Sequence, residues 1–328
     1  MNRFAASLLL LLTGGITLAN LLFADVVNRP EAELKRFSYT QLQMAMPMQL
    51  TVWCESEEAA QESCKLAFDR ASELVKIFSD YDPDSEINRL LNSEIGVPHP
   101  VSRELFEVLS FSQQLHQDSG GAFDPAAGQL TALWRKARRA GELPDPSLLQ
   151  PMPNEAGLDR LKLDRQNQSV TLRSRRMRLD FGGVAKGYIG DQVIELLRQQ
   201  NIHSAKYHAG GDIVLSASPP NNTDGWKIQV TDTDGSVVQR RLSDCGLSMS
   251  GDLNQHLEAD GVRYSHVVDP RSGFGINSGR WAVVVAPSGM QSDAIATTGC
   301  ILDDDELQQL AKRYSGTSAW SNFGTPEN

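Results

Sequence analysis

The sequence predicts an α+β fold in a single domain, and three observations support that prediction. Amphipathic helical segments and short strand segments both occur, but they do not follow the regular βαβ order of a doubly wound sheet. The 328 residues are 40% hydrophobic and 22% charged, which is an ordinary composition for a globular protein that buries a core. No internal repeat is visible, so a solenoid is not expected.

The first 24 residues predict export. Arg3 is followed by an apolar run that continues, through Gly14 and Gly15, to Ala24. A positive start before an apolar segment is typical of a secretory signal, and this segment is also about long enough to cross a bilayer. Residues 1–24 are therefore expected to be a signal peptide or an uncleaved N-terminal membrane anchor. The expected location is the periplasm or cell envelope, with anchoring to the inner membrane in the second case.

The first elements of the folded part are expected after a polar linker at residues 25–43. Residues 49–53 alternate polar and apolar side chains, which favours a strand, and apolar residues at helical spacing predict a long amphipathic helix over residues 57–78. Residues 81–86 predict a turn that opens a short helix. A further helix is expected over residues 103–116.

The second half of the chain predicts more strands than helices. The apolar run 281–286 lacks polar alternation, so we expect a strand buried on both faces. A Pro- and Gly-rich surface connection is expected at 139–157, and an unstructured tail at 316–328, so that the domain covers residues 44–315. The other expected elements are a hairpin at 161–172, a strand interrupted by two glycines at 206–215, strands at 226–231 and 237–242, and helices at 184–200, 292–302 and 304–314.

Charge and cysteine content exclude several classes of function. Acidic residues outnumber basic ones by 41 to 31, giving a net charge of −10, and no stripe of Lys and Arg with interleaved aromatics occurs. A nucleic-acid partner is therefore not expected. The four cysteines form no C-x-x-C pair, which argues against a zinc knuckle or a thioredoxin motif. Cys54 and Cys64 either form a disulfide or stay buried thiols.

Two glycines precede the helix that is expected from residue 184. Gly182 and Gly183 would let the backbone approach a ligand closely, and the unpaired N–H groups of a helix N-terminus favour a phosphate. Lys186 adds a positive charge and Asp180 a carboxylate. The segment lacks the patterns of a P-loop and of a dinucleotide fingerprint, so by itself it favours a plain strand-to-helix turn over a phosphate site.

Other residues with chemical potential lie later and earlier in the chain. His266 and Asp269 flank a turn, where a histidine beside a carboxylate can act as a general base or as a structural hydrogen-bonding group. Asp293 and Thr297 are four residues apart, so on a helix they share a face. A carboxylate and a hydroxyl suit Mg²⁺, although a helix cap and a back-bonding threonine would give the same pattern. The rings of Tyr81 and of Phe123, in the AFDP segment at 122–125, could stack on a flat ligand.

The order of these segments resembles that of the ApbE-type FAD:protein FMN transferases, over residues 44–302. The matching segments are YDPDSEINRL at 81–90, AFDP at 122–125, DFGGVAKGY at 180–188, GGDI at 210–213, SGD at 250–252, SHVVDPRSG at 265–273 and SDAIAT at 292–297. The sequence departs from the family pattern at Met46 and Met249, where hydroxyl residues are usual, and at Gly275, where proline is frequent.

The resemblance implies a single flavin-binding domain and a Mg²⁺-dependent transfer. A Ser or Thr hydroxyl of an acceptor protein would attack the FMN phosphorus of FAD, and AMP would leave. His266 would be the base, and Mg²⁺ would be bound by Asp293, Thr297 and the carbonyl of Gly183. The residues implied to surround FAD are Met44, Tyr81, Ala122, Phe123, Asp124, Asp180, Lys186 and Ile276.

Two alternative functions stay open from the sequence. The same site with water as the nucleophile would be a metal-dependent FAD pyrophosphatase that releases FMN and AMP. A chain that bound the flavin without reacting would be an exported flavin-binding protein.

Overall fold

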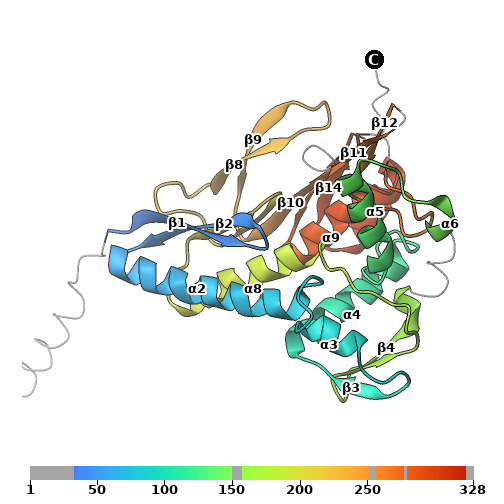
Figure 1. Ribbon diagram of the computed structural model, residues 1–328. Helices are drawn as coiled ribbons and strands as arrows, with labels where there is room; N and C mark the ends of the chain where they lie inside the picture. Colours follow the sequence, from blue (N-terminus) through green and yellow to red (C-terminus); the bar gives the residue numbers. More distant parts are fainter. Residues whose placement is uncertain (1–32, 150–156, 252–255, 260, 277–278, 323–328) are drawn as a thin grey trace, which may run out of the picture.

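A seven-stranded antiparallel sheet forms the centre of the computed structural model, which describes residues 33–149, 157–251, 256–259, 261–276 and 279–322 (Figure 1). Every neighbouring pair of strands is antiparallel. In spatial order the strands are β1 (Lys35–Gln43), β2 (Met46–Cys54), β6 (Ala205–Ala209), β7 (Asp212–Leu215), β10 (Cys245–Gly251), β13 (Trp281–Ala286) and β14 (Ser318–Ser321). The prediction of an α+β fold is confirmed.

Three helices lie against the sheet, and one of them packs against both of the others. They are α2 (Glu57–Phe78), α8 (Ala185–Gln199) and α9 (Gly289–Gly299), and Figure 1 shows α2 and α8 running along the same side of the sheet. The small residues Ala60, Ala67 and Ala71 are fully buried on α2, so this helix can approach its neighbours closely. The main core lies between these helices and the sheet.

Smaller elements extend this core. A three-stranded sheet has the order β3-β5-β4, and two hairpins pair β8 with β9 and β11 with β12. Trp134 on α5 packs with Leu257 of β11 in a separate apolar cluster. The elements are α3 (Glu86–Leu91), β3 (Pro98–Pro100), α4 (Arg103–Asp118), α5 (Gly128–Ala140), α6 (Pro146–Leu149), η1 (Leu158–Arg160), β4 (Leu161–Asp164), β5 (Ser169–Leu172), β8 (Trp226–Thr231), β9 (Val237–Leu242), β11 (His256–Ala259), β12 (Val262–Ser265) and α10 (Asp304–Arg313).

The prediction of a linker at residues 25–43 is wrong for residues 35–43. Residues 35–43 form the edge strand β1, which pairs with β2 along its whole length. Phe37 and Tyr39 of β1 pack against the main core. The other residues are mostly polar because an edge strand leaves much of its surface in water, and that polarity was the reason to predict a linker. Residues 1–32 lie outside the described part of the chain.

Two further expectations are corrected at turns and at the end of the domain. The segment 206–215 is not one strand with a bulge, because Ala209 pairs directly with Asp212 and the two glycines between them form a hairpin turn. Gly210 has φ +62°, a conformation that glycine adopts without strain. The expected tail at 316–328 contains β14, which pairs with β13 and forms the edge of the sheet opposite β1. The hairpin at 161–172 is confirmed.

Among the described residues, none of the helices combines the length and the apolar character that a membrane crossing requires. All four cysteines are free thiols. Burial, together with the nearby Cys54 thiol, raises the pKa of Cys64 to about 12, so this thiol is protonated and unreactive at neutral pH.

Candidate active site

Helix α8 begins at the loop whose glycines were noted in the sequence. Asp180 accepts a hydrogen bond from the Gly182 N–H at 2.9 Å, which shapes the turn before the helix. Gly187, in the first turn, is so close to α9 that an added Cβ would lie 2.0 Å from the backbone oxygen of Gly289. Glycine is therefore required at this position, and the close approach brings the start of α8 against α9.

Lys186 lies between two aspartates that come from different elements. Its Nζ is 3.0 Å from Asp212 Oδ2 on β7 and 3.1 Å from Asp293 Oδ1 on α9. The same Nζ donates to the Gly182 carbonyl at 2.8 Å, and the Gly187 N–H donates to Asp293 Oδ2 at 3.0 Å. Asp212 and Asp293 are only 3% and 1% exposed. Helix α8, strand β7 and helix α9 thus meet at one buried ion cluster.

This cluster holds two acidic groups and one basic group. Burial and the carboxylate of Asp212 raise the pKa of Asp293 to about 7. Burial alone would lower the pKa of Lys186, but the carboxylates of Asp212 and Asp293 raise it above its ordinary value. The ammonium group therefore stays charged at neutral pH while two buried carboxylates share it. An additional cation would be favourable at this place because it would offset the excess negative charge.

Thr297 extends the cluster by one helical turn. Its Oγ1 is 3.3 Å from Ser250 Oγ at the end of β10, and a Cβ added to Gly183 would lie 2.9 Å from the same Oγ1. The lack of a side chain at Gly183 therefore lets the loop before α8 touch Thr297. Asp293, Thr297 and Gly183 are brought together, as the resemblance implies.

The simpler interpretation of Asp293 and Thr297 is wrong. Ser288, not Asp293, is the N-cap of α9, and Asp293 lies inside the helix. The hydroxyl that donates back to a helix carbonyl belongs to Thr298, which bonds to Ala294 at 2.7 Å. The Asp293 carboxylate is instead directed at Lys186, and neither side chain is explained by helix capping.

The oxygen donors at this cluster fit a hard cation. A carboxylate and a hydroxyl are ligands of the kind that Mg²⁺ prefers. Within the described ranges, no group of three or more His, Cys, Asp or Glu side chains forms a metal-binding cluster. A metal ion here would therefore need the remaining oxygens from the backbone, from water or from a substrate.

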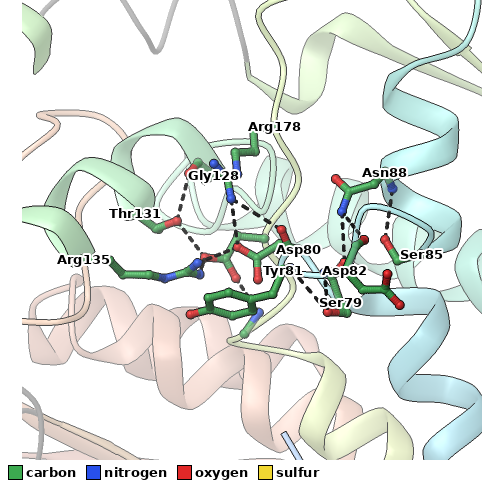
Figure 2. A network of polar contacts seen from close by, with 12 residues as sticks. Ser79, Asp80, Tyr81, Asp82, Ser85, Asn88, Gly128, Thr131, Arg135 and Arg178 are labelled. Carbon is green, nitrogen blue, oxygen red and sulfur yellow. Dashed lines mark hydrogen bonds and ion pairs between the residues drawn. The ribbon is translucent and has the colours of Figure 1, made fainter. Parts of the chain in front are cut away.

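A second ion network is formed around Arg135, which Figure 2 shows beside Asp80 and Tyr81. Arg135 on α5 bonds to Asp180 and, at 2.5 Å, to Asp80 Oδ2, and Thr131 Oγ1 donates to Asp180 Oδ2 at 2.6 Å. The guanidinium carbon of Arg135 is also 4.8 Å from the centroid of the Tyr81 ring. The structure therefore joins Asp180 and Tyr81, two of the residues assigned to FAD, through an arginine.

Two backbone N–H groups hold the carboxylate of Asp124 in place. Its Oδ1 accepts from the Ala126 N–H at 2.8 Å and its Oδ2 from the Leu158 N–H at 3.2 Å. Burial raises its pKa. The side chains of Ala122 and Phe123 are 1% and 5% exposed and belong to the main core. These side chains are directed into the protein, so the segment would meet a ligand mainly with its backbone.

His266, Ile276 and Met44 lie on loops and turns. His266 follows β12 and is half-buried, and Ile276 packs against the main core. The carboxylate of Asp269, three residues after His266, accepts from Arg271 Nε at 3.0 Å. Met44 lies in the β1–β2 turn with φ +50° and also packs against the core.

The comparison with known families decides the relationship of this chain. The sequence model of the ApbE family matches residues 44–320. The chain belongs to the ApbE family.

Relatives and solved structures agree with this membership. The FAD:protein FMN transferase of Haemophilus influenzae is 29% identical over 248 residues, 72% of this chain and 71% of the relative. The enzyme of the same name from Treponema pallidum is 29% identical over 70% of this chain and 68% of its own length. The apo form of the flavinyl transferase ApbE from Pseudomonas stutzeri superposes with a TM-score of 0.77 at 25% identity, covering 89% of this chain and 92% of that one.

Sequence reasoning missed several residues of this ApbE-family site. Asp212 lay in the quoted GGDI segment but received no role, and an acidic residue in an otherwise apolar strand was the available signal. Arg135, Thr131 and Asp80 belong to no segment that was singled out. The spacing of Thr131 and Arg135, four residues apart on a helix, placed them on one face but did not identify Asp180 as their common partner.

Proposed function

We propose that this chain is a Mg²⁺-dependent FAD:protein FMN transferase. The observation that carries the proposal is the buried cluster in which Lys186 lies between Asp212 and Asp293, next to Thr297 and the N-terminus of α8. Membership of the ApbE family and the names of the relatives support the same activity.

The proposed reaction exchanges the phosphoanhydride bond of FAD for a phosphoester bond to the acceptor. The hydroxyl oxygen of a Ser or Thr of the acceptor bonds to the FMN phosphorus of FAD. The bond from this phosphorus to the bridging oxygen breaks, and AMP leaves with that oxygen. His266 takes the hydroxyl proton. FMN remains on the acceptor through its phosphate.

The residues of this chain would mainly position the reactants and balance charge, because phosphoryl transfer depends on both. Lys186 supplies a fixed positive charge, and the N–H groups at the start of α8 favour a phosphate. Asp293, Thr297 and the Gly183 carbonyl would hold Mg²⁺, which when bound neutralises negative charge on the pyrophosphate. The Tyr81 ring, 69% exposed, offers a surface for a flat ring of FAD.

The location of the reaction is also part of the proposal. We expect residues 1–24, which lie outside the described residues, to export the chain to the periplasm or cell envelope and in the anchored case to hold it at the inner membrane. The acceptor would then be an exported protein with a Ser/Thr flavinylation motif.

The deciding experiment mixes the purified protein with FAD, Mg²⁺ and a domain that carries the motif Asp-Gly-x-Ser/Thr-Gly-Ala-Thr/Ser. Mass spectrometry should find FMN on the acceptor, and EDTA should abolish the product. Free FMN and AMP without an adduct would instead indicate an FAD pyrophosphatase. FAD binding without cleavage would indicate a flavin-binding protein.

The role of His266 gives a separate prediction. His266→Ala should lower the rate of transfer by about 100-fold or more, the usual contribution of a general base, while FAD still binds. The matched control is His99→Ala on β3, in the separate three-stranded sheet, which should transfer normally. Normal transfer by His266→Ala would contradict its assignment as the base.

A further inference from the structure

Tyr81 is an exposed aromatic ring with a cation behind it. The residue lies in the turn between α2 and α3, and 69% of its surface is exposed. The guanidinium carbon of Arg135 is 4.8 Å from the ring centroid. A guanidinium this close to an aromatic face is attracted to the electron-rich face of the ring, so the ring has a fixed support on one side and an accessible surface elsewhere.

Arg135 is itself held in place from two directions. One end of the guanidinium bonds to Asp80 and the other to Asp180, and both carboxylates are largely buried, at 8% and 12% exposure. Asp80 precedes Tyr81 in the chain, whereas Asp180 lies in the loop before α8. A planar fork can span two carboxylates and still present its face to a ring, which a lysine ammonium group cannot do. The arginine thus fixes the turn of Tyr81 relative to the loop before α8.

Two further arginines lie close to Arg135 and Asp80. Burial and the neighbouring charge of Arg135 lower the pKa of Arg138, one turn further along α5. Arg178 approaches the same carboxylate, with its Nη2 3.6 Å from Asp80 Oδ2. The three guanidinium groups exceed the two carboxylates of this network by one positive charge, which favours a ligand that combines a flat ring with negative charge, as a nucleotide does.

We propose that Arg135 is the positioning residue of the flavin-binding surface: by bridging Asp80 and Asp180 it holds the Tyr81 ring in the orientation that accepts a flat ring of FAD. This inference rests on the proposed function, because FAD is taken as the ligand. Arg135 acts on FAD binding through the Tyr81 ring rather than on the reacting atoms. Its loss therefore weakens FAD binding and leaves the transfer step almost unchanged.

The test measures FAD affinity and transfer kinetics on the purified full chain. In Arg135→Lys, the Kd and the KM for FAD should rise about tenfold, as expected for losing a cation–π contact and one arm of the fork. The kcat should stay within about twofold. Arg139→Gln is the matched control, because it removes a positive charge from the exposed end of the same helix, and it should leave both values unchanged. Wild-type affinity in Arg135→Lys, or a fall in kcat at unchanged affinity, would overturn the inference.

A double-mutant cycle separates positioning from general damage to the fold. Tyr81→Leu removes the ring from an exposed position, where it should not affect folding. Adding Arg135→Lys to Tyr81→Leu should weaken FAD binding no further than Tyr81→Leu does alone. Additive effects of the two substitutions would refute action through the ring. Failure of the wild-type chain to bind FAD would refute the proposed function itself, a result distinct from equal binding by wild type and Arg135→Lys.

Discussion

Lys186 and Arg135 each lie between two aspartates, but the two networks differ in cation and in burial. The ammonium of Lys186 joins Asp212 and Asp293, which are almost completely buried. The guanidinium of Arg135 joins Asp80 and Asp180 at a less enclosed place, beside the exposed ring of Tyr81. A compact ammonium fits a closed site and balances charge there, whereas a planar fork sets the direction of its partners.

The difference suggests separate tasks for the two networks. In the buried cluster, the excess of carboxylate is a reason to bind a metal ion. In the arginine network, Arg178 adds a second cation near Asp80, so the charges of the carboxylates are better balanced. The main effect of this network is therefore to orient the Tyr81 ring. Substitutions in the first network should therefore change the reaction and the stability of the fold, and those in the second should change ligand affinity.

The largest effect is expected from Asp293→Asn. This change removes a proposed metal ligand while keeping the shape of the side chain, so transfer should fall by about two orders of magnitude or more. Mass spectrometry of the FMN adduct across a series of Mg²⁺ concentrations would measure it. Asp80→Asn is the comparison variant, and its defect should appear in FAD affinity at unchanged Mg²⁺ dependence. Near-normal transfer by Asp293→Asn would contradict the assignment of the reaction to the Lys186 cluster and of FAD affinity to the Arg135 network.

A large loss of stability is expected from Lys186→Met. The substitution leaves Asp212 and Asp293 buried without their cation, which typically costs about 3–5 kcal/mol of unfolding free energy. Urea unfolding would measure the loss, and adding Asp212→Asn should restore part of it. Lys65→Met is the control, because Lys65 and Asp69 form an exposed pair that should contribute less than about 1 kcal/mol. Equal stability of the two lysine variants would show that burial of the cluster is not costly.

The smallest effect concerns a third buried carboxylate and its pH dependence. Asp191 accepts from the N–H groups of Gly289 and Met290 at 2.6 and 2.9 Å, and burial raises its pKa from 3.8 to about 6. The folded protein binds this proton more tightly than the unfolded chain, so stability falls as pH rises from about 4 to about 6.

The pH dependence of Asp191 is measured as a difference between variants. Asp191→Asn cannot ionise, so its stability relative to the wild type should rise by about 1–3 kcal/mol over this pH range. Urea unfolding at several pH values would follow the difference. A difference that stays constant with pH would show that burial alone does not raise the pKa of the Asp191 carboxylate. It would also weaken the argument that burying the carboxylates of the Lys186 cluster is costly.

The sequence by itself determined the class of fold and much of the candidate site. Periodicity located the long helices, because an amphipathic helix repeats its apolar residues in a pattern that depends only on local geometry. Gly183, Lys186, Asp293 and Thr297 belonged to short segments with recognisable order, and the structure brings them together.

Only the tertiary structure decided which residues complete the two networks. Asp212 and Lys186 are 26 residues apart in the chain, and Arg135 joins Asp80 to Asp180 across 55 and 45 residues. No local pattern records such pairings, because they arise when strands and helices pack. The same reason explains β1 and β14, whose polar sequences became strands only because β2 and β13 offered them hydrogen-bonding edges.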